Sequence, residues 1–226
     1  DKVVVVLLCC LHCGFLETAR KPAVYSARRK ISIGMLRGVS LVMGTGLEND
    51  KPIVVLTRRW PESVEIALAQ RYALVRNEND AAFSADQLVA ALTQADVLCP
   101  TVTDALTAEV FAAAARIGIR AKLLANFGVG FNHIDLAAAK ANGLTITNTP
   151  GVLTAATAEI AMTLLLMCAR RAGAGERLVR SGDWRGWYPT HMLSTQVTGK
   201  TLGIVGMGRI GTAMARQAHH GFGMRI

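Results

Sequence analysis

Residues 201–222 of this 226-residue chain, TLGIVGMGRIGTAMARQAHHGF, constrain its fold more than any other stretch. The apolar run 202–205 predicts a short strand that leads into a glycine-rich turn, and alanines then recur at helical spacing. Gly206 suits the tight turn, Gly208 allows the backbone to approach a pyrophosphate, and Gly211 allows the helix to pack closely on the strand. The pattern predicts a dinucleotide-binding turn, with an ordinary strand-to-helix turn as the alternative.

Composition and charge place the chain among globular proteins. Hydrophobic residues make up 51% and charged residues 18% of the sequence, which excludes a disordered tail. The net charge is +9, yet the Lys and Arg residues are scattered and no aromatic residues interleave with them. We therefore expect no nucleic-acid partner, and a basic surface that helps to attract anionic substrates.

Residues 1–50 differ from the rest in composition. The apolar run 3–16 is too short to span a bilayer, and a basic stretch without acidic residues follows it. A signal-peptide core, a transit peptide, a missing true N-terminus and a foreign extension all remain open. We expect this segment to lie outside the fold, with poorly defined structure. We also expect a cytoplasmic protein without a membrane partner, with mitochondrial targeting by residues 1–50 as the alternative.

The five cysteines predict neither a disulfide framework nor a metal site. Cys9, Cys10 and Cys13 lie next to His12 without a second ligand pair to complete a tetrahedral site, so we expect no metal. The remaining two, at positions 99 and 168, lie in apolar runs and are predicted to be buried, reduced thiols.

From residue 51 onward, strands alternate with helices. Strands are predicted within 52–61, 73–79, 95–100, 121–128 and 144–150, and helices from Pro61 and over 84–92, 107–115 and 134–143. Ser84 and Gln87 have the spacing of a capping box. This alternation predicts a parallel sheet with helices on both faces, and we expect residues 51–148 to form one small α/β domain.

Residues 149–226 read as a hinge followed by the start of a second α/β unit. Pro150 and Gly151 mark the hinge, and a helix over 154–171 is apolar enough to predict a buried core helix rather than a membrane span. Residues 173–198 predict a looser segment, and the second unit begins at Gly199.

Several motifs in this order resemble one family. NFGVGFNHIDLAAAKANGLTITNTPGVLTAATAEIAMTLLLMCAR, followed by GDWRGWYPTHML and GKTLGIVGMGRIG, closely resembles the D-isomer-specific 2-hydroxyacid dehydrogenases. The RRWPESVE stretch and the two tryptophans resemble the glyoxylate and hydroxypyruvate reductase branch. The resemblance covers residues 51–226 and implies a flavodoxin-like substrate domain followed by an incomplete Rossmann domain that binds NAD or NADP.

On the substrate side, the resemblance implies roles for one loop and one tryptophan. The loop after the fourth strand begins at Gly128, and the backbone amides of Val129, Gly130 and Phe131 would hold the substrate carboxylate. From the residues alone, a plain strand-to-helix turn is the favoured interpretation of this loop. Trp187 resembles a tryptophan that reaches across a dimer interface to the partner's substrate pocket, which implies a homodimer in the complete protein.

On the cofactor side, Thr157 matches a threonine near the nicotinamide, and Arg209 and Ile210 match positions that line the pyrophosphate and adenosine, beside the three glycines of the turn. The family's catalytic Arg, Glu and His have no match in this chain and are expected beyond Ile226. The resemblance implies reduction of small 2-keto acids, such as glyoxylate or hydroxypyruvate, to 2-hydroxy acids. The alternatives are a non-catalytic dinucleotide-sensing or interaction protein and an inactive fragment.

Overall fold

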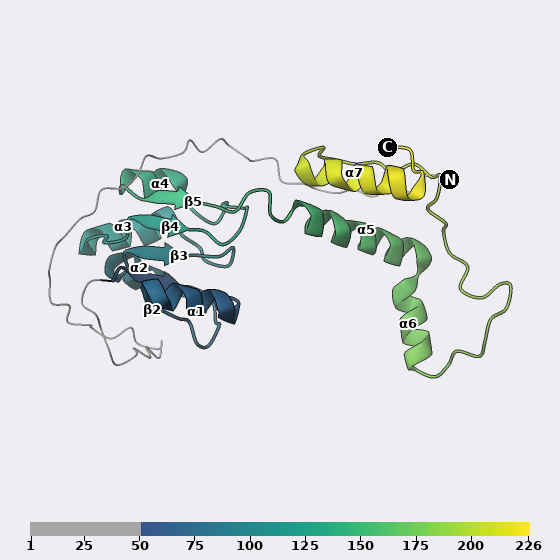
Figure 1. Cartoon of the computed structure of the whole chain (residues 1–226), viewed down its shortest axis with the longest axis horizontal. Helices are drawn as coiled ribbons and strands as arrows, with labels where there is room; N and C mark the ends of the chain where they lie inside the picture. The colour runs from purple at the N-terminus through teal and green to yellow at the C-terminus, as the bar shows by residue number, and fades with distance from the viewer. Residues whose placement is uncertain (1–50) are drawn as a thin grey trace. The chain divides into compact units, whose positions relative to one another are not determined.

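The computed structural model describes residues 51–226, which divide into two compact units, 51–150 and 151–226. Figure 1 draws both units. The predictions made for residues 1–50, including targeting and the cluster around His12, lie outside the described residues.

The first unit is built on a five-stranded, wholly parallel sheet with the strand order β2-β1-β3-β4-β5 (Figure 1). This is the order of flavodoxin-like doubly wound folds, so the expected fold class is confirmed. The strands are shorter than the apolar runs that predicted them: β1 Ile53–Leu56, β2 Ala73–Val75, β3 Val97–Cys99, β4 Leu123–Ala125 and β5 Thr145–Thr147.

Helices cover both faces of this sheet, as the alternating pattern predicted. The four helices are α1 Glu62–Arg71, α2 Ala85–Gln94, α3 Ala108–Ile117 and α4 Leu136–Ala141. The larger core joins α2, α3 and α4 to the sheet around Leu92, Leu98 and Phe111, whereas Leu68 of α1 packs on a smaller core around Leu56. One face of the sheet is therefore buried against the larger core, and the other carries the smaller core but leaves Thr145 and Thr147 of β5 exposed.

Local signals set the start of two of these helices. The Ser84 side chain accepts a hydrogen bond from Gln87 N, and the Gln87 side chain accepts one from Ser84 N, so the predicted capping box is confirmed. Asp135 caps α4 by accepting a hydrogen bond from Ala138 N at 2.8 Å. These caps fix where the loops at the carboxyl edge of the sheet end.

The second unit consists of α5 Thr154–Arg170, α6 Ala172–Arg180 and α7 Arg209–Phe222. Its core joins α5 and α7 through Met162, Leu165 and Met214, together with Leu202. The looser segment predicted over 173–198 was partly wrong, because its first residues continue as α6. An αL residue, Arg171, separates α6 from α5 and changes the direction of the chain.

The strand predicted over 202–205 is not formed as a ladder. Within residues 151–226, the only bridge in this stretch pairs Thr201 with Arg225. Leu202 N donates to Arg225 O at 2.7 Å as part of this pairing, whereas residues 203–205 gain no strand pairing from the described chain. Leu202 is nevertheless buried, as its apolar pattern predicted.

The helix α5, predicted to be a buried core helix, is buried on one side only. Ile160 and Leu164 are 55% and 54% exposed, although Met162 and Leu165 are buried. Cys168 is exposed, which corrects its predicted burial, because it lies away from the α7-facing side of α5. Among the helices of residues 51–226, none is both long and apolar enough to cross a bilayer.

Candidate functional site

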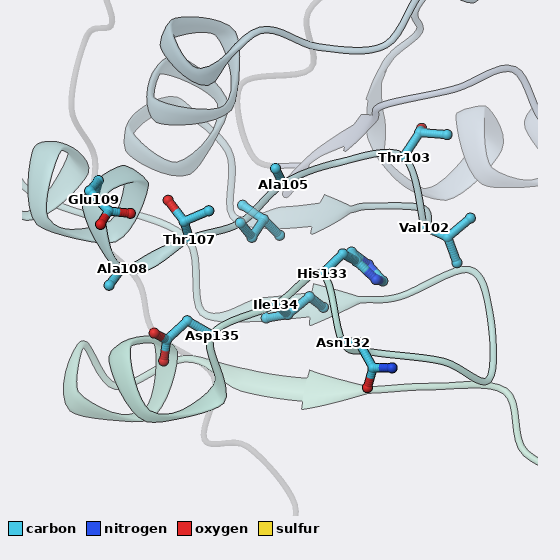
Figure 2. A pocket seen from close by; sticks show the side chains of 11 residues that line it. Val102, Thr103, Ala105, Thr107, Ala108, Glu109, Asn132, His133, Ile134 and Asp135 are labelled. Carbon is cyan, nitrogen blue, oxygen red and sulfur yellow. The ribbon is translucent and has the colours of Figure 1, made fainter. Parts of the chain in front are cut away.

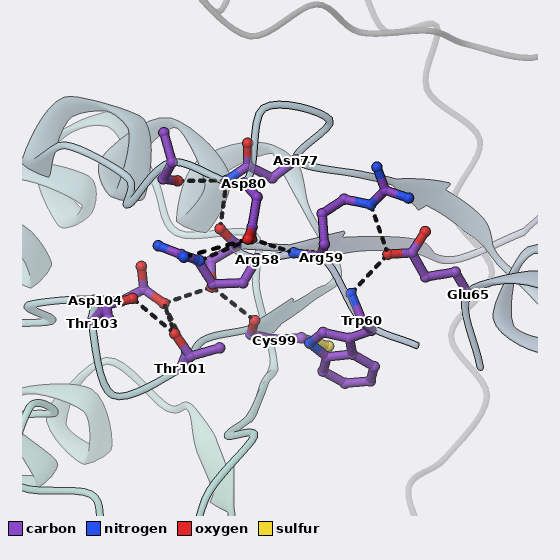
Figure 3. A network of polar contacts seen from close by, with 12 residues as sticks. Arg58, Arg59, Trp60, Glu65, Asn77, Asp80, Cys99, Thr101, Thr103 and Asp104 are labelled. Carbon is purple, nitrogen blue, oxygen red and sulfur yellow. Dashed lines mark hydrogen bonds and ion pairs between the residues drawn. The ribbon is translucent and has the colours of Figure 1, made fainter. Parts of the chain in front are cut away.

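The carboxyl ends of β1 and β3 are tied together by a buried polar network (Figure 3). Asp104 is fully buried, and its Oδ2 accepts hydrogen bonds from Thr57 Oγ1 at 2.5 Å and Thr101 N at 2.7 Å. Asn77 donates to Thr57 O at 2.7 Å and so adds the segment after β2. In doubly wound sheets, ligands bind outside the carboxyl ends of the strands, which is the edge that this network stiffens.

The loop after β1 is held by charged pairs and then meets an aromatic contact. The buried Glu65 accepts hydrogen bonds from Trp60 N at 2.8 Å and Arg76 Nε at 3.0 Å. Asp80 accepts from Arg59 N, and this backbone hydrogen bond, together with the charge of Arg58, lowers the pKa of its carboxyl group (Figure 3). The polar pairs therefore fix the backbone on which Trp60 sits.

The Trp60 ring packs on Phe127, with ring centroids 5.0 Å apart. Phe127 is the residue that leads into the loop expected to hold a substrate carboxylate, and 51% of its surface is exposed. The loops after β1 and β4 are therefore in direct contact at the carboxyl edge of the sheet.

The carbonyl groups of that loop are all hydrogen-bonded. Asn126 Nδ2 donates to Gly128 O at 3.1 Å and to Gly130 O at 2.9 Å, and Asn148 Nδ2 donates to Val129 O at 2.9 Å. Thr149 N adds a second bond to Gly128 O at 3.0 Å. Side chains placed directly after β4 and β5 thus hold three successive carbonyls.

The amide groups of the same loop are open. Within residues 51–226, no hydrogen bond is made by the N–H groups of Val129, Gly130 or Phe131. Each of these N–H groups shares a peptide unit with one of the held carbonyls, and a trans peptide points its N–H away from its C=O. Three successive N–H donors are therefore presented without a partner, an arrangement that suits an anion.

A shallow cavity of about 580 Å³ lies beside this loop, between the chain after β3 and the segment ahead of α4 (Figure 2). Thr103, Thr107, Glu109, His133 and Asp135 are among its lining residues, whereas Val129, Gly130 and Phe131 are not. The cavity therefore does not coincide with the three free amides. His133 lines this cavity, and burial lowers its pKa, while the charge of Asp104 acts in the opposite direction.

The glycine turn of the second unit has the close packing that its spacing predicted. Gly206 has φ +96°, and a Cβ placed on Gly211 would lie 2.1 Å from Gly206 O. Gly208 is the N-cap of α7 and leaves the helix without a side-chain cap. The turn therefore accepts no side chain at Gly211, and the helix N-terminus offers uncapped amides to an anion.

The remaining expected site residues lie on different elements of the second unit. Arg209, Ile210 and Gly211 form the first turn of α7. Thr157 is in the first turn of α5, where its hydroxyl donates to Leu153 O at 2.8 Å. Trp187 lies in the segment after α6 and is 79% exposed. Its expected role at a partner's pocket stays a prediction.

Sequence reasoning missed the residues that shape the loop after β4: Asn126, His133, Asn148 and Trp60. Asn126 and Asn148 do carry a signal, since each is a polar residue directly after a predicted parallel strand. No spacing rule predicts the bond from His133 to Asn126. Within residues 51–226, no group of three His, Cys, Asp or Glu side chains is placed to hold a metal ion.

Comparison with known proteins gives the family. The sequence model for the catalytic domain of D-isomer specific 2-hydroxyacid dehydrogenases matches residues 53–220, well over half of the chain. The chain belongs to this family. A glyoxylate reductase from Korarchaeum cryptofilum is 42% identical to it over 177 residues, which cover 78% of this chain and 52% of that enzyme.

Solved structures of 2-hydroxyacid dehydrogenases share the fold. A protein from Polaromonas sp. JS6 66, which carries the name of a D-isomer specific, NAD-binding 2-hydroxyacid dehydrogenase, is 42% identical with a TM-score of 0.71, over 77% of this chain and 54% of that one. An NADPH-dependent glyoxylate/hydroxypyruvate reductase from Sinorhizobium meliloti, solved with NADP and malonate, is 30% identical with a TM-score of 0.62, over 77% and 52%. The chain thus spans about half the length of the relatives it matches.

Proposed function

We propose that this chain supplies the substrate domain, residues 51–148, and the hinge and opening of the NAD(P)-binding domain, residues 149–226, of an oxidoreductase. The complete protein would reduce small 2-keto acids, such as glyoxylate or hydroxypyruvate, to 2-hydroxy acids. The observation that carries the proposal is the row of three unpartnered N–H groups at Val129, Gly130 and Phe131. The loop lies at the carboxyl edge of the sheet, in a chain of the matching family.

The loop suits a carboxylate for an electrostatic reason. Backbone N–H groups carry partial positive charge, and several that face one concavity bind an anion without a charged side chain. Gly128 and Gly130 have no side chains to block the approach of the ligand. A site made of backbone amides recognises the carboxylate that all 2-keto acids share, so the choice among these acids falls to other residues. Our candidate for the residue that selects among these acids is Trp187 of a second copy of the chain in a homodimer.

The cofactor assignment rests on the glycine turn. A dinucleotide pyrophosphate would lie against Gly206, Gly208 and Gly211 at the N-terminus of α7, with Arg209 and Ile210 beside it and Thr157 on the nicotinamide side. The uncapped N-terminus of α7 and the excluded Cβ at Gly211 fit such a group. When bound, NADH or NADPH would supply a hydride to the keto carbon.

The acid/base chemistry is assigned to residues that this chain does not contain. We expect the catalytic Arg, Glu and His beyond Ile226, since the chain spans only about half the length of its relatives. We also infer a cytoplasmic location, with mitochondrial targeting by residues 1–50 as the alternative.

The test is steady-state reduction of glyoxylate, hydroxypyruvate and other short 2-keto acids by the complete protein, with NADH and NADPH measured separately. We expect oxidation of one or both cofactors, and the D isomer when the product is chiral. Failure to oxidise either cofactor with every short 2-keto acid would overturn the proposal. The 226-residue chain serves as the matched inactive control, because it contains none of the expected catalytic residues.

Calorimetry with the 226-residue chain separates the second candidate, a non-catalytic dinucleotide-sensing protein. The uncapped, intact glycine turn is the observation that favours it. Sub-millimolar binding of NAD(H) or NADP(H) by the chain, together with an inactive complete protein, would support sensing. The absence of binding by the chain, together with an active complete protein, would support the enzyme.

A further inference from the structure

Asn126 has an unusual set of partners for one side chain. It follows β4 directly and is only 2% exposed, and its amide nitrogen is shared between Gly128 O and Gly130 O. Both partners are carbonyl oxygens, which only accept hydrogen bonds, so the group that faces them must be the NH₂ and not the oxygen. The side-chain amide of Asn126 therefore has one fixed orientation.

That orientation determines the protonation of His133. Asn126 Oδ1 must face His133 Nε2, which lies 3.0 Å away. Because Oδ1 can only accept, Nε2 must carry the hydrogen. Burial lowers the pKa of His133, and the charge of Asp104 acts in the opposite direction. Burial thus favours the neutral ring, which in this network carries its single hydrogen on Nε2.

The two side chains control which way two peptide units face. The carbonyl of Gly128 shares its peptide with the N–H of Val129, and the carbonyl of Gly130 shares its peptide with the N–H of Phe131. As long as Asn126 holds both carbonyls, both N–H groups point away from it. A reversed peptide would place its carbonyl oxygen, instead of its N–H group, next to the substrate carboxylate. The two oxygens would then repel each other.

We propose that Asn126 and His133 are positioning residues for substrate binding, with His133 orienting the Asn126 amide and Asn126 holding the loop amides toward the substrate carboxylate. This inference rests on the proposed function of the loop. Neither side chain needs to touch the substrate. Their effect therefore falls on affinity for the 2-keto acid, and not on affinity for the dinucleotide.

The kinetic test uses the complete protein and four variants. Asn126→Asp replaces the two N–H donors with carboxylate oxygens, His133→Leu removes the donor to Asn126, and His133→Gln retains an amide donor near the Nε2 position. Asn142→Asp is the matched control, because Asn142 Nδ2 also bonds a carbonyl, Ala138 O at 2.8 Å, but at the end of α4. We expect Asn126→Asp and His133→Leu to raise KM for the 2-keto acid about 10-fold to 100-fold.

In the same measurements, KM for NAD(P)H should stay within about twofold, His133→Gln should recover most of the loss, and Asn142→Asp should behave as the wild type. If the wild type reduces 2-keto acids and both site variants keep its KM, the positioning role is wrong while the proposed function stands. Equal losses in His133→Leu and His133→Gln, or in the Asn142→Asp control, would also overturn it.

Nuclear magnetic resonance without ligand tests the inference independently of the proposed function, even if the wild type reduces no 2-keto acid. Nitrogen chemical shifts of the His133 ring in the 226-residue chain should show the hydrogen on Nε2 near neutral pH, and the side-chain amide protons of Asn126 should be protected from exchange. His133→Leu should shift the amides of Val129 and Phe131. A ring protonated on Nδ1 instead, or unchanged loop amides in that variant, contradicts the inference.

Discussion

Two glycine loops of this chain, each following a predicted strand and leading toward a helix, are built in opposite ways. The loop 128–131 is shaped by side chains, because Asn126 and Asn148 hold its carbonyls. The turn 206–211 is shaped by the absence of side chains, because Gly211 lies against Gly206 O. The first should therefore be sensitive to the loss of polar atoms, and the second to the addition of a single methyl group.

The largest effect is expected for Gly211→Ala. Its Cβ would lie 2.1 Å from Gly206 O, a backbone atom that can move only with the turn. We expect a loss of about 1–3 kcal/mol in the free energy of unfolding and loss of dinucleotide binding. Urea denaturation and calorimetry measure the two effects.

Gly221→Ala is the matched control in the same helix, because a Cβ there would contact nothing within 4 Å. It should stabilise α7 by up to about 1 kcal/mol. Equal destabilisation by both substitutions would show that the close approach at Gly211 does not shape the turn.

The next effect is expected for Asn148→Ala, which removes the donor to Val129 O. The free energy of unfolding should fall by about 1 kcal/mol, because the carbonyl loses its hydrogen bond. The backbone amide resonance of Gly130 should shift, since that N–H shares the peptide unit with Val129 O. In the control Asn142→Ala, the Gly130 resonance should be unchanged; an equal shift there would mean that the effect comes from a general loosening of the domain.

The pH dependence of stability should carry a smaller contribution from His133. Burial lowers the pKa of His133 below its usual 6.5, so the unfolded chain binds more protons than the folded one as pH falls through that value. Stability should therefore decrease toward acid pH, by less than about 1.4 kcal/mol per pH unit from this group. Urea midpoints of the wild type and His133→Gln between neutral and mildly acid pH measure it, and identical slopes would contradict the prediction.

The smallest stability effect is expected for Gly208→Ser. Gly208 has φ −76°, which other residues adopt, and a Cβ would contact nothing within 4 Å. A serine there would cap α7 and stabilise it by a few tenths of a kcal/mol. The same hydroxyl would occupy the amides offered to a pyrophosphate, so NAD(P) affinity should fall while the melting temperature holds or rises. Unchanged affinity would argue against a phosphate at this helix N-terminus.

The sequence was most informative where the pattern was local or repeated. Alternating strands and helices predicted the parallel sheet, and Ser84 with Gln87 predicted a helix start that the structure confirms. The glycine spacing predicted the close contact at Gly211 because that contact follows from three positions within one turn.

The failures arose where partners distant in sequence decide the outcome. Residues 202–205 have a strand pattern, but within the described residues only Thr201 and Leu202 pair with Arg225. The burial of Cys168 was wrong because the apolar run of α5 does not reveal which side packs on α7. The bonds from Asn126 and Asn148 to the loop depend on two strands that lie side by side, which no spacing in one segment encodes.

The most direct test of the loop at 128–131 as the carboxylate site is titration of the 226-residue chain with glycolate, a small 2-hydroxy acid, observed through its backbone amide resonances. The amides of Val129, Gly130 and Phe131 should shift most, with saturation, while those of Gly206, Gly208 and Gly211 stay unchanged. Saturable shifts confined to other residues, or no shifts at these three amides, would contradict the assignment.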